Sequence, residues 1–242
     1  NSSYHDLVEA TANYTFSLQD NSHNFNVLAG TSYERYRKDE MDATASNMNS
    51  NDFFSFNYYD SSINTNTQIG DNIEPWKMMS YFGRINYNFK ERYLLEANVR
   101  YDGSSRLTPD KRWKAFPSVS AAWRISEESW FKVDWISQLK LRASWGQLGN
   151  GAILGLYDYI PLINNQQSNM PPTYMGEKWF YQANLASKEK TWETIETTNI
   201  GIDFGFLNNR LNGSFEYYWK YNNDMLSSLQ LPHQIGINVP KM

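Results

Sequence analysis

The sequence predicts an all-β chain whose antiparallel strands run up and down as a segment of a transmembrane β-barrel. Three observations predict this fold: apolar and polar residues alternate, the alternating segments are about 9–11 residues long, and short and long connections follow one another. The chain has 242 residues, of which 40% are apolar and 16% aromatic, and its net charge is −4. No stretch approaches the roughly 20 consecutive apolar residues of a membrane helix, which excludes a helical membrane protein.

The alternation is clearest from Val8 to Leu18, where every second residue is apolar and the residues between are polar or charged. The same period predicts eight strands in order, at residues 8–18, 24–34, 79–89, 93–102, 117–126, 138–146, 197–207 and 210–222. The apolar positions of these segments hold no Asp, Glu, Lys or Arg, whereas the opposite positions collect the charges. Such one-sided charge is typical of a barrel wall with lipid outside and a polar interior, but a soluble β-sandwich also alternates, so alternation alone does not separate the two.

The connections between the predicted strands differ in length. They are short or modest at residues 19–23, 90–92, 127–137 and 208–209, and longer at 35–78, 103–116 and 147–196. Outer-membrane barrels show this asymmetry, with tight turns on one side and long loops on the other, whereas a Greek-key sandwich has no reason to show it. Asn208 and Asn209 suit a hairpin because Asn tolerates positive φ. We expect Pro117 at the first position of its strand, where the missing N–H costs least.

Aromatic residues gather at the ends of the strands that meet the short turns. They are Tyr87, Phe89, Tyr93, Trp123, Trp130, Trp135, Phe204 and Phe206. Rings with a polar edge favour the membrane–water boundary, so we expect these residues to form a girdle there. The alternative is that they are core aromatics of a soluble sheet.

Several classes of function are disfavoured by what the sequence lacks. Cysteine is absent, and His5, His23 and His233 are far apart, so we expect no disulfide and no metal site. The slight excess of acid, without a basic stripe, argues against nucleic-acid binding. We find no nucleophile elbow, phosphate loop or zinc-protease motif. We therefore expect no catalytic residue, no enzyme activity and no cofactor, while calcium in the acidic loops stays open.

Several specific stretches run through most of residues 79–226. They are SYFGRINY at 80–87, YLLEANVRYDGSSR at 93–106, FPSVSAAWR at 116–124, LKLRASWG at 139–146 followed by Gly149 and Asn150, ETTNIGID at 196–203, and EYY at 216–218. Together they resemble the SusC/RagA-like TonB-dependent outer-membrane transporters.

The resemblance implies a barrel of 22 strands closed by an N-terminal plug domain, energised through TonB, in the outer membrane of a Gram-negative cell. It also implies a SusD-like surface lipoprotein that delivers an oligosaccharide or peptide for import. We expect residues 1–242 to be about eight strands of that barrel in contact with lipid, with the plug domain and the remaining strands absent. The alternative is a secreted or surface β-sandwich that binds carbohydrate, in which Val8, Tyr14, Val99, Ile200 and Phe215 would pack between two sheets.

Two sets of residues are candidates for functional contacts. The first set comprises charges expected to face the lumen: Arg84, Glu96, Arg100, Arg124, Arg142 and Glu216. They would contact the plug or a passing substrate, or they would neutralise one another across neighbouring strands. The second set comprises Phe54, Phe56, Tyr58, Tyr59 and Trp179, whose rings offer rigid contact area to a ligand or a lid. For these aromatics the alternative is packing of one loop on another.

Overall fold

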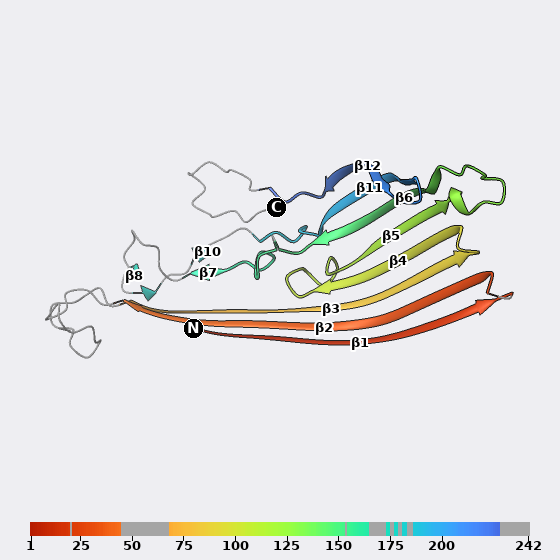
Figure 1. Cartoon of the computed structure of the whole chain (residues 1–242). Coiled ribbons are helices and arrows are strands. Elements are labelled where there is room, and N and C mark those ends of the chain that lie inside the picture. The colour runs from red at the N-terminus through yellow and green to blue at the C-terminus, as the bar shows by residue number, and fades with distance from the viewer. Residues whose placement is uncertain are drawn as a thin grey trace, which may run out of the picture.

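The computed structural model describes residues 1–19, 21–44, 68–152, 154–164, 173–174, 177–178, 181–182 and 186–227. Its long strands are β1 (Ser2–Leu18), β2 (His23–Thr44), β3 (Gln68–Phe89), β4 (Tyr93–Ser104), β5 (Trp113–Arg124), β6 (Ile136–Asn150), β11 (Glu193–Phe206) and β12 (Leu211–Asn223). They form one 8-stranded antiparallel sheet in the order β1-β2-β3-β4-β5-β6-β11-β12 (Figure 1). The predicted strands and their up-and-down order are confirmed.

Small elements occupy two of the connections. A 3-10 helix, η2 (Ile125–Glu127), follows β5. Between β6 and β11, β7 (Ile163–Asn164) pairs with β10 (Tyr181–Gln182), and β8 (Thr173–Tyr174) pairs with β9 (Glu177–Lys178). Within the described ranges, no helix has both the length and the apolar character needed to cross a membrane.

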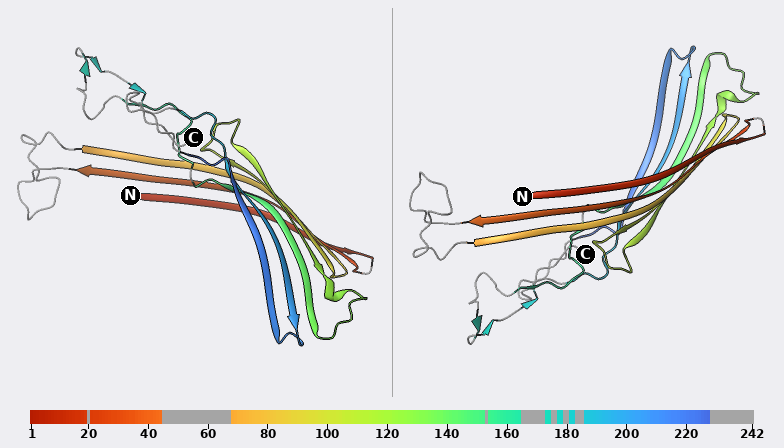
Figure 2. Two further views of the ribbon diagram at one scale, coloured as in Figure 1. Left: turned by 90° about the horizontal axis from the view of Figure 1, so that it is seen from above. Right: turned by 90° about the horizontal axis from the view of Figure 1, so that it is seen from below.

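The sheet is strongly twisted and open. In the two views of Figure 2, β1, β2 and β3 run across the direction of β11 and β12, and β1 and β12 form the two edges. A right-handed twist between neighbouring strands accumulates in this way over a wide antiparallel sheet. The described residues therefore form a curved wall rather than a closed barrel.

The register separates the sheet into two faces of opposite character. Asn98 pairs with Arg84 on one side and Ser118 on the other, while Val99 pairs with Gly83 and Pro117. Side chains alternate along a strand, and paired residues share a face. This register therefore places the polar side chains of neighbouring strands on one face of the wall and the apolar side chains on the other. We call the face of Val99 the apolar face and the face of Asn98 the polar face.

The side chains of the apolar face are not covered. Val8 is 66% exposed, Tyr14 68%, Val99 47%, Ile200 52% and Phe215 66%. A β-sandwich would bury such residues against a second sheet. The eight long strands form a single sheet, so the β-sandwich alternative is wrong for the described part of the chain.

Two rows of aromatic rings border the apolar face. The row at the short turns is the predicted one, with Phe89 stacked on Tyr93 at 6.1 Å and Tyr93 stacked on Trp123 at 6.3 Å between ring centroids. A second row, which the sequence analysis did not identify, places Trp113 against Tyr101 at 5.0 Å and Tyr81 at 6.0 Å. The strand from Tyr93 to Tyr101 is about 27 Å long. That length suits the apolar band of an outer-membrane barrel, about 25 Å tall.

The ends of several strands differ from the prediction. β2 and β3 remain paired from Arg35–Lys77 out to Thr44–Gln68, so both ends of the predicted 35–78 connection, about half of its residues, are strand. Beyond the apolar band both faces of this ribbon mix charged residues with apolar or aromatic ones, among them Ile73 and Trp76, so pairing continues after the alternation has ended. β4 and β5 are also longer than predicted, which leaves residues 105–112 as a shorter loop than 125–135. The alternation of connection lengths is therefore not strict there.

The turn chemistry is only partly as predicted. Asn208 and Asn209 have φ of 58° and 60°, as expected, and Leu207 joins them at 53°. Pro117 is not the first residue of its strand, since β5 begins at Trp113. It lies directly before the β5–β6 ladder, which begins at Ser118 and Gly146, so its missing N–H falls outside that ladder.

Candidate binding site

A small hydrophobic core lies on the polar face, at the end of the sheet with the long connections. Leu107, Phe116, Leu154 and Trp192 are its buried members. The Phe116 and Trp192 rings meet edge to face at 5.5 Å, and the Trp192 Nε1–H donates to the Arg112 carbonyl at 2.9 Å. Leu154 and Trp192 belong to the connection between β6 and β11, so these contacts pack that part of the connection against the sheet.

A glycine permits this close packing. The Phe116 ring lies so near the Gly149 backbone that a Cβ at that position would be 2.2 Å from the ring Cζ. Only Gly allows such an approach without displacing the ring. Since Phe116 is 5% exposed and held by Trp192, it has little room to move.

A buried ion pair fixes the two ends of the same connection. Lys190, 3% exposed, pairs with the Asp158 carboxylate. Asp158 also accepts the Gly155 N–H at 3.1 Å, and its carbonyl accepts the Ser187 N–H at 2.7 Å. Buried lysine is costly unless it is paired in this way. The pair therefore holds the segments before and after β7–β10 together.

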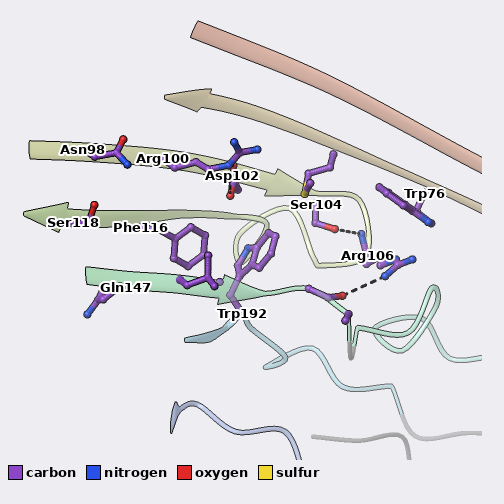
Figure 3. A pocket seen from close by; sticks show the side chains of 15 residues that line it. Trp76, Asn98, Arg100, Asp102, Ser104, Arg106, Phe116, Ser118, Gln147 and Trp192 are labelled. Carbon is purple, nitrogen blue, oxygen red and sulfur yellow. Dashed lines mark hydrogen bonds and ion pairs between the residues drawn. The ribbon is translucent and has the colours of Figure 1, made fainter. Parts of the chain in front are cut away.

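A cavity of about 600 Å³ lies beside this core (Figure 3). Trp76 and Met78 of β3, Arg100 and Asp102 of β4, and Arg106 after β4 line one side of it. Phe116 and Trp192 close the other side. The volume is in the range of small-ligand sites, and the lining combines aromatic rings with a few charged groups, as such sites do.

Arg100 is fully engaged within the protein. Its Nε donates to both Asp102 carboxylate oxygens, at 2.8 and 3.0 Å, and its Nη2 donates to the Ser80 hydroxyl at 2.9 Å. Its guanidinium carbon also lies 5.5 Å from the Phe82 ring centroid. Arg100 and Asp102 therefore neutralise each other in the cavity wall.

Arg106 is positioned but not neutralised. Its guanidinium lies over the Trp76 ring, with Cζ 4.8 Å from the centroid, and its Nη1 donates to the Gly151 carbonyl at 3.3 Å. Its Nε is buried without a hydrogen-bond partner among the described residues. Burial lowers the pKa of Arg106 from its ordinary value, because desolvation disfavours the charged form.

The register places all six predicted lumen charges on the polar face, and four of them have ionic partners. Arg142 pairs with Glu216 and, at 3.2 Å, with Asp203, while its guanidinium lies over Gly201. Arg124 pairs with Glu127 at 3.4 Å and Glu91 at 3.7 Å. Only the Arg142–Glu216 pair joins two members of the set, since Arg100 pairs within its own strand and Arg124 with residues of the connections. Whether this face lines a lumen stays a prediction.

The remaining two members of that set lack such partners. Arg84 and Glu96 form no ion pair within 4.0 Å among the described residues. The Arg84 Nε is buried and has no hydrogen-bond partner there. Phe54, Phe56, Tyr58, Tyr59 and Trp179, the predicted ligand or lid contacts, lie outside the described residues. In the part of the chain that the structure describes, no three His, Asp or Glu side chains lie close enough together to hold a metal ion.

The sequence analysis did not identify the cavity residues Trp76, Arg106 and Trp192. Arg106 belongs to the stretch at 93–106 that carries the resemblance, but nothing in its spacing marks it as a binding residue. Trp76 falls in the predicted 35–78 connection and Trp192 in the 147–196 connection. Trp192 lies five residues before the predicted 197–207 strand, and nothing in its position marks it as a binding residue.

The chain matches known proteins along its whole length. The family model described as "TonB dependent receptor-like, beta-barrel" matches residues 1–241. The TonB-dependent receptor SusC of Bacteroides thetaiotaomicron is 39% identical over 166 residues, which cover 66% of this chain and 16% of that protein. The TonB-dependent receptor P26 of Formosa agariphila is 30% identical over 231 residues, or 95% of this chain and 23% of that protein.

A solved structure described as the RagAB peptide transporter contains a chain of the same fold. It superposes with a TM-score of 0.86 at 25% identity and covers 99% of this chain and 26% of that chain. This chain therefore spans about a quarter or less of the length of the proteins it matches. From the strand order, the two-faced wall and the match over residues 1–241, the chain belongs to the TonB-dependent receptor-like β-barrel family.

Proposed function

We propose that the complete protein imports a large nutrient, an oligosaccharide or a peptide, across the outer membrane of a Gram-negative cell. In this proposal TonB supplies the energy through an N-terminal part outside these residues, and a SusD-like lipoprotein covers the mouth. The proposal is supported by membership of the TonB-dependent receptor-like family and by the similarity to SusC and to the RagAB peptide transporter. It is transport rather than catalysis.

The observation that carries the proposal is the contrast between the two faces of the wall. The apolar face is exposed and bordered by two rows of aromatic rings, which suits a surface in contact with lipid. The polar face holds the ion pairs and the cavity. A barrel wall needs this arrangement if solute is to pass on one side and hydrocarbon to lie on the other.

The position of the cavity supports solute entry from the side of the long connections. It lies where residues 151, 152 and 192 of the connection between β6 and β11 meet β3–β6, at the end away from the short turns. We also propose that Phe54, Phe56, Tyr58, Tyr59 and Trp179 contact the lid or the ligand, because their connections leave the sheet at this same end.

The proposal is tested by purifying the tagged full-length protein from native outer membrane and identifying what accompanies it by mass spectrometry. We expect a surface lipoprotein in stoichiometric amount together with a glycan or peptide. A strain lacking the gene should lose uptake of that nutrient, and so should a strain lacking TonB. Recovery of the protein in the soluble fraction, or uptake that is independent of TonB, would contradict the proposal.

A further inference from the structure

The charged residues that line the cavity leave one positive charge uncompensated. They are Arg100, Asp102 and Arg106, and the first two form an ion pair at 2.8 Å. The remaining charge belongs to the Arg106 guanidinium, which has no ionic partner within 4.0 Å among the described residues. An unpaired charge beside apolar walls is costly, so its retention there points to a ligand group that pairs with it.

Two acidic residues favour the charged form of Arg106, but neither forms an ion pair with it within 4.0 Å. Glu34 and Glu74 are close enough to act on Arg106 electrostatically. Glu34, however, lies 2.6 Å from the His5 Nε2, and Glu74 accepts a hydrogen bond from the Asn72 amide at 3.1 Å. Neither carboxylate occupies the cavity side of the guanidinium, since neither lines the cavity.

The guanidinium is also held in a fixed orientation. The Trp76 ring supports its plane, and the Gly151 carbonyl accepts from Nη1 at 3.3 Å. The Arg106 backbone N–H donates to the Ser104 hydroxyl at 3.3 Å, which fixes the start of the loop (Figure 3). Such pre-organisation reduces the entropy lost when a ligand binds. The Nη2 group makes no hydrogen bond within the described residues and is left to donate.

We infer that this cavity binds a carboxylate of the transported nutrient and that Arg106 is the residue that recognises it. This inference rests on the proposed function and specifies the substrate class. One excess positive charge matches a monoanion, whereas a phosphate, with about −1.5 to −2 charges, would remain partly uncompensated. A uronic acid in an oligosaccharide and the C-terminus of a peptide carry the same group, and both have an apolar part that suits Trp76 and Met78.

The test is isothermal titration calorimetry on the full-length protein in detergent with four probes. Maltohexaose and an oligogalacturonate of the same length form one pair, and a hexapeptide with a free or an amidated C-terminus forms the other. We expect one acidic probe to bind about tenfold to hundredfold more tightly than its neutral partner, as a charge-assisted hydrogen bond provides. The pair that shows this difference identifies the source of the carboxylate.

Variants test whether Arg106 causes the difference in affinity between the acidic and the neutral probes. Arg106→Gln should bring the affinity for the acidic probe down to that for its neutral partner, while Arg106→Lys should keep part of the preference. Arg210→Gln is the matched control, because Arg210 lies exposed in the turn before β12, at the opposite end of the sheet. It should behave like the wild type.

Three outcomes would overturn the inference: equal affinity for acidic and neutral probes, a preference that survives in Arg106→Gln, or no binding of any probe. The proposed function is judged separately by TonB-dependent uptake in cells. If uptake persists while the probes show no preference, the carboxylate assignment fails and the transport assignment stands. If uptake is absent, the transport assignment fails whatever the probes show.

Discussion

The Tyr93 hydroxyl donates a hydrogen bond to the Glu128 carboxylate at 2.7 Å and so joins the first residue of β4 to the connection after β5. The Trp123 Nε1–H donates to the same oxygen at 3.0 Å, and Arg92 lies 3.4 Å from the other oxygen. Two members of the aromatic row at the short turns are thereby oriented by one acid. Glu128 is 9% exposed, so these bonds replace most of its contact with water.

Glu128 should make stability depend on pH. The hydrogen bonds from Tyr93 and then Trp123 hold the pKa of Glu128 below its ordinary value, because they favour the charged form. A lowered pKa contributes stability that is present above the ordinary value and lost as pH falls through the lowered one. In the full-length protein, Glu128→Gln should melt at a lower temperature than the wild type at pH 7. The difference in melting temperature should shrink below pH 4. Glu189→Gln, with a side chain 90% exposed, is the control. An equal deficit at all pH values would contradict this role.

A methyl group at Gly149 should disturb the core on the polar face. Gly149→Ala places a Cβ 2.2 Å from the Phe116 ring, which Trp192 holds in place, and such overpacking costs about 1–3 kcal/mol. Gly83→Ala is the matched control, because its Cβ would have 3.7 Å to the nearest atom, the Leu28 carbonyl oxygen. The measurement is the free energy of unfolding in urea. Equal stability of the two variants would show that Phe116 moves aside easily.

Removing the buried ammonium of Lys190 should loosen the connection between β6 and β11. Lys190→Met leaves the Asp158 carboxylate without its cation, at a cost of about 1–3 kcal/mol. Hydrogen exchange should then increase at residues 154–160 and 186–190 more than in the sheet. Lys111→Met should have little effect, because its pair with Glu189 is exposed and 3.6 Å long. The double variant Lys190→Met/Asp158→Asn should recover part of the protection against hydrogen exchange. Equal exchange in all variants would contradict a role of Lys190 in holding the connection.

A charge on the apolar face should impair membrane assembly, whereas the same charge on the polar face should not. Val119 and Ser120 are adjacent and exposed but lie on opposite faces of β5. An arginine at the bilayer midplane of a barrel costs about 2–4 kcal/mol on the lipid side. Val119→Arg should therefore lower the amount of heat-modifiable, folded protein in outer-membrane fractions, while Ser120→Arg should not. If Ser120→Arg is the more damaging change, the two faces have been assigned the wrong way round.

The strands could be predicted because the environment acts on them directly. Val99 and Asn98 lie on opposite faces of the wall, and the sequence records the difference between the two faces at every second position. The outer halves of β2 and β3 could not be predicted in this way. From Arg35 to Thr44 charged residues fall on both faces, and the strand is maintained by pairing with Gln68–Lys77 rather than by burial.

The cavity could not be predicted because no single segment contains it. Trp76, Arg106 and Trp192 lie in different parts of the chain, and only the folded structure brings them to one cavity. The candidate charges were placed on the correct face by alternation alone. Their partners, such as Asp203 and Glu216 for Arg142, depend on the register of three strands and therefore require the structure.

The long β2–β3 ribbon sets the depth at which the cavity lies. Trp76 pairs with Tyr36, and from there the ribbon continues to Thr44 and Gln68, which adds about 25 Å of strand above the cavity. A molecule bound beside Trp76 would therefore lie about 25 Å below the tip of this ribbon, which flanks its approach on one side only.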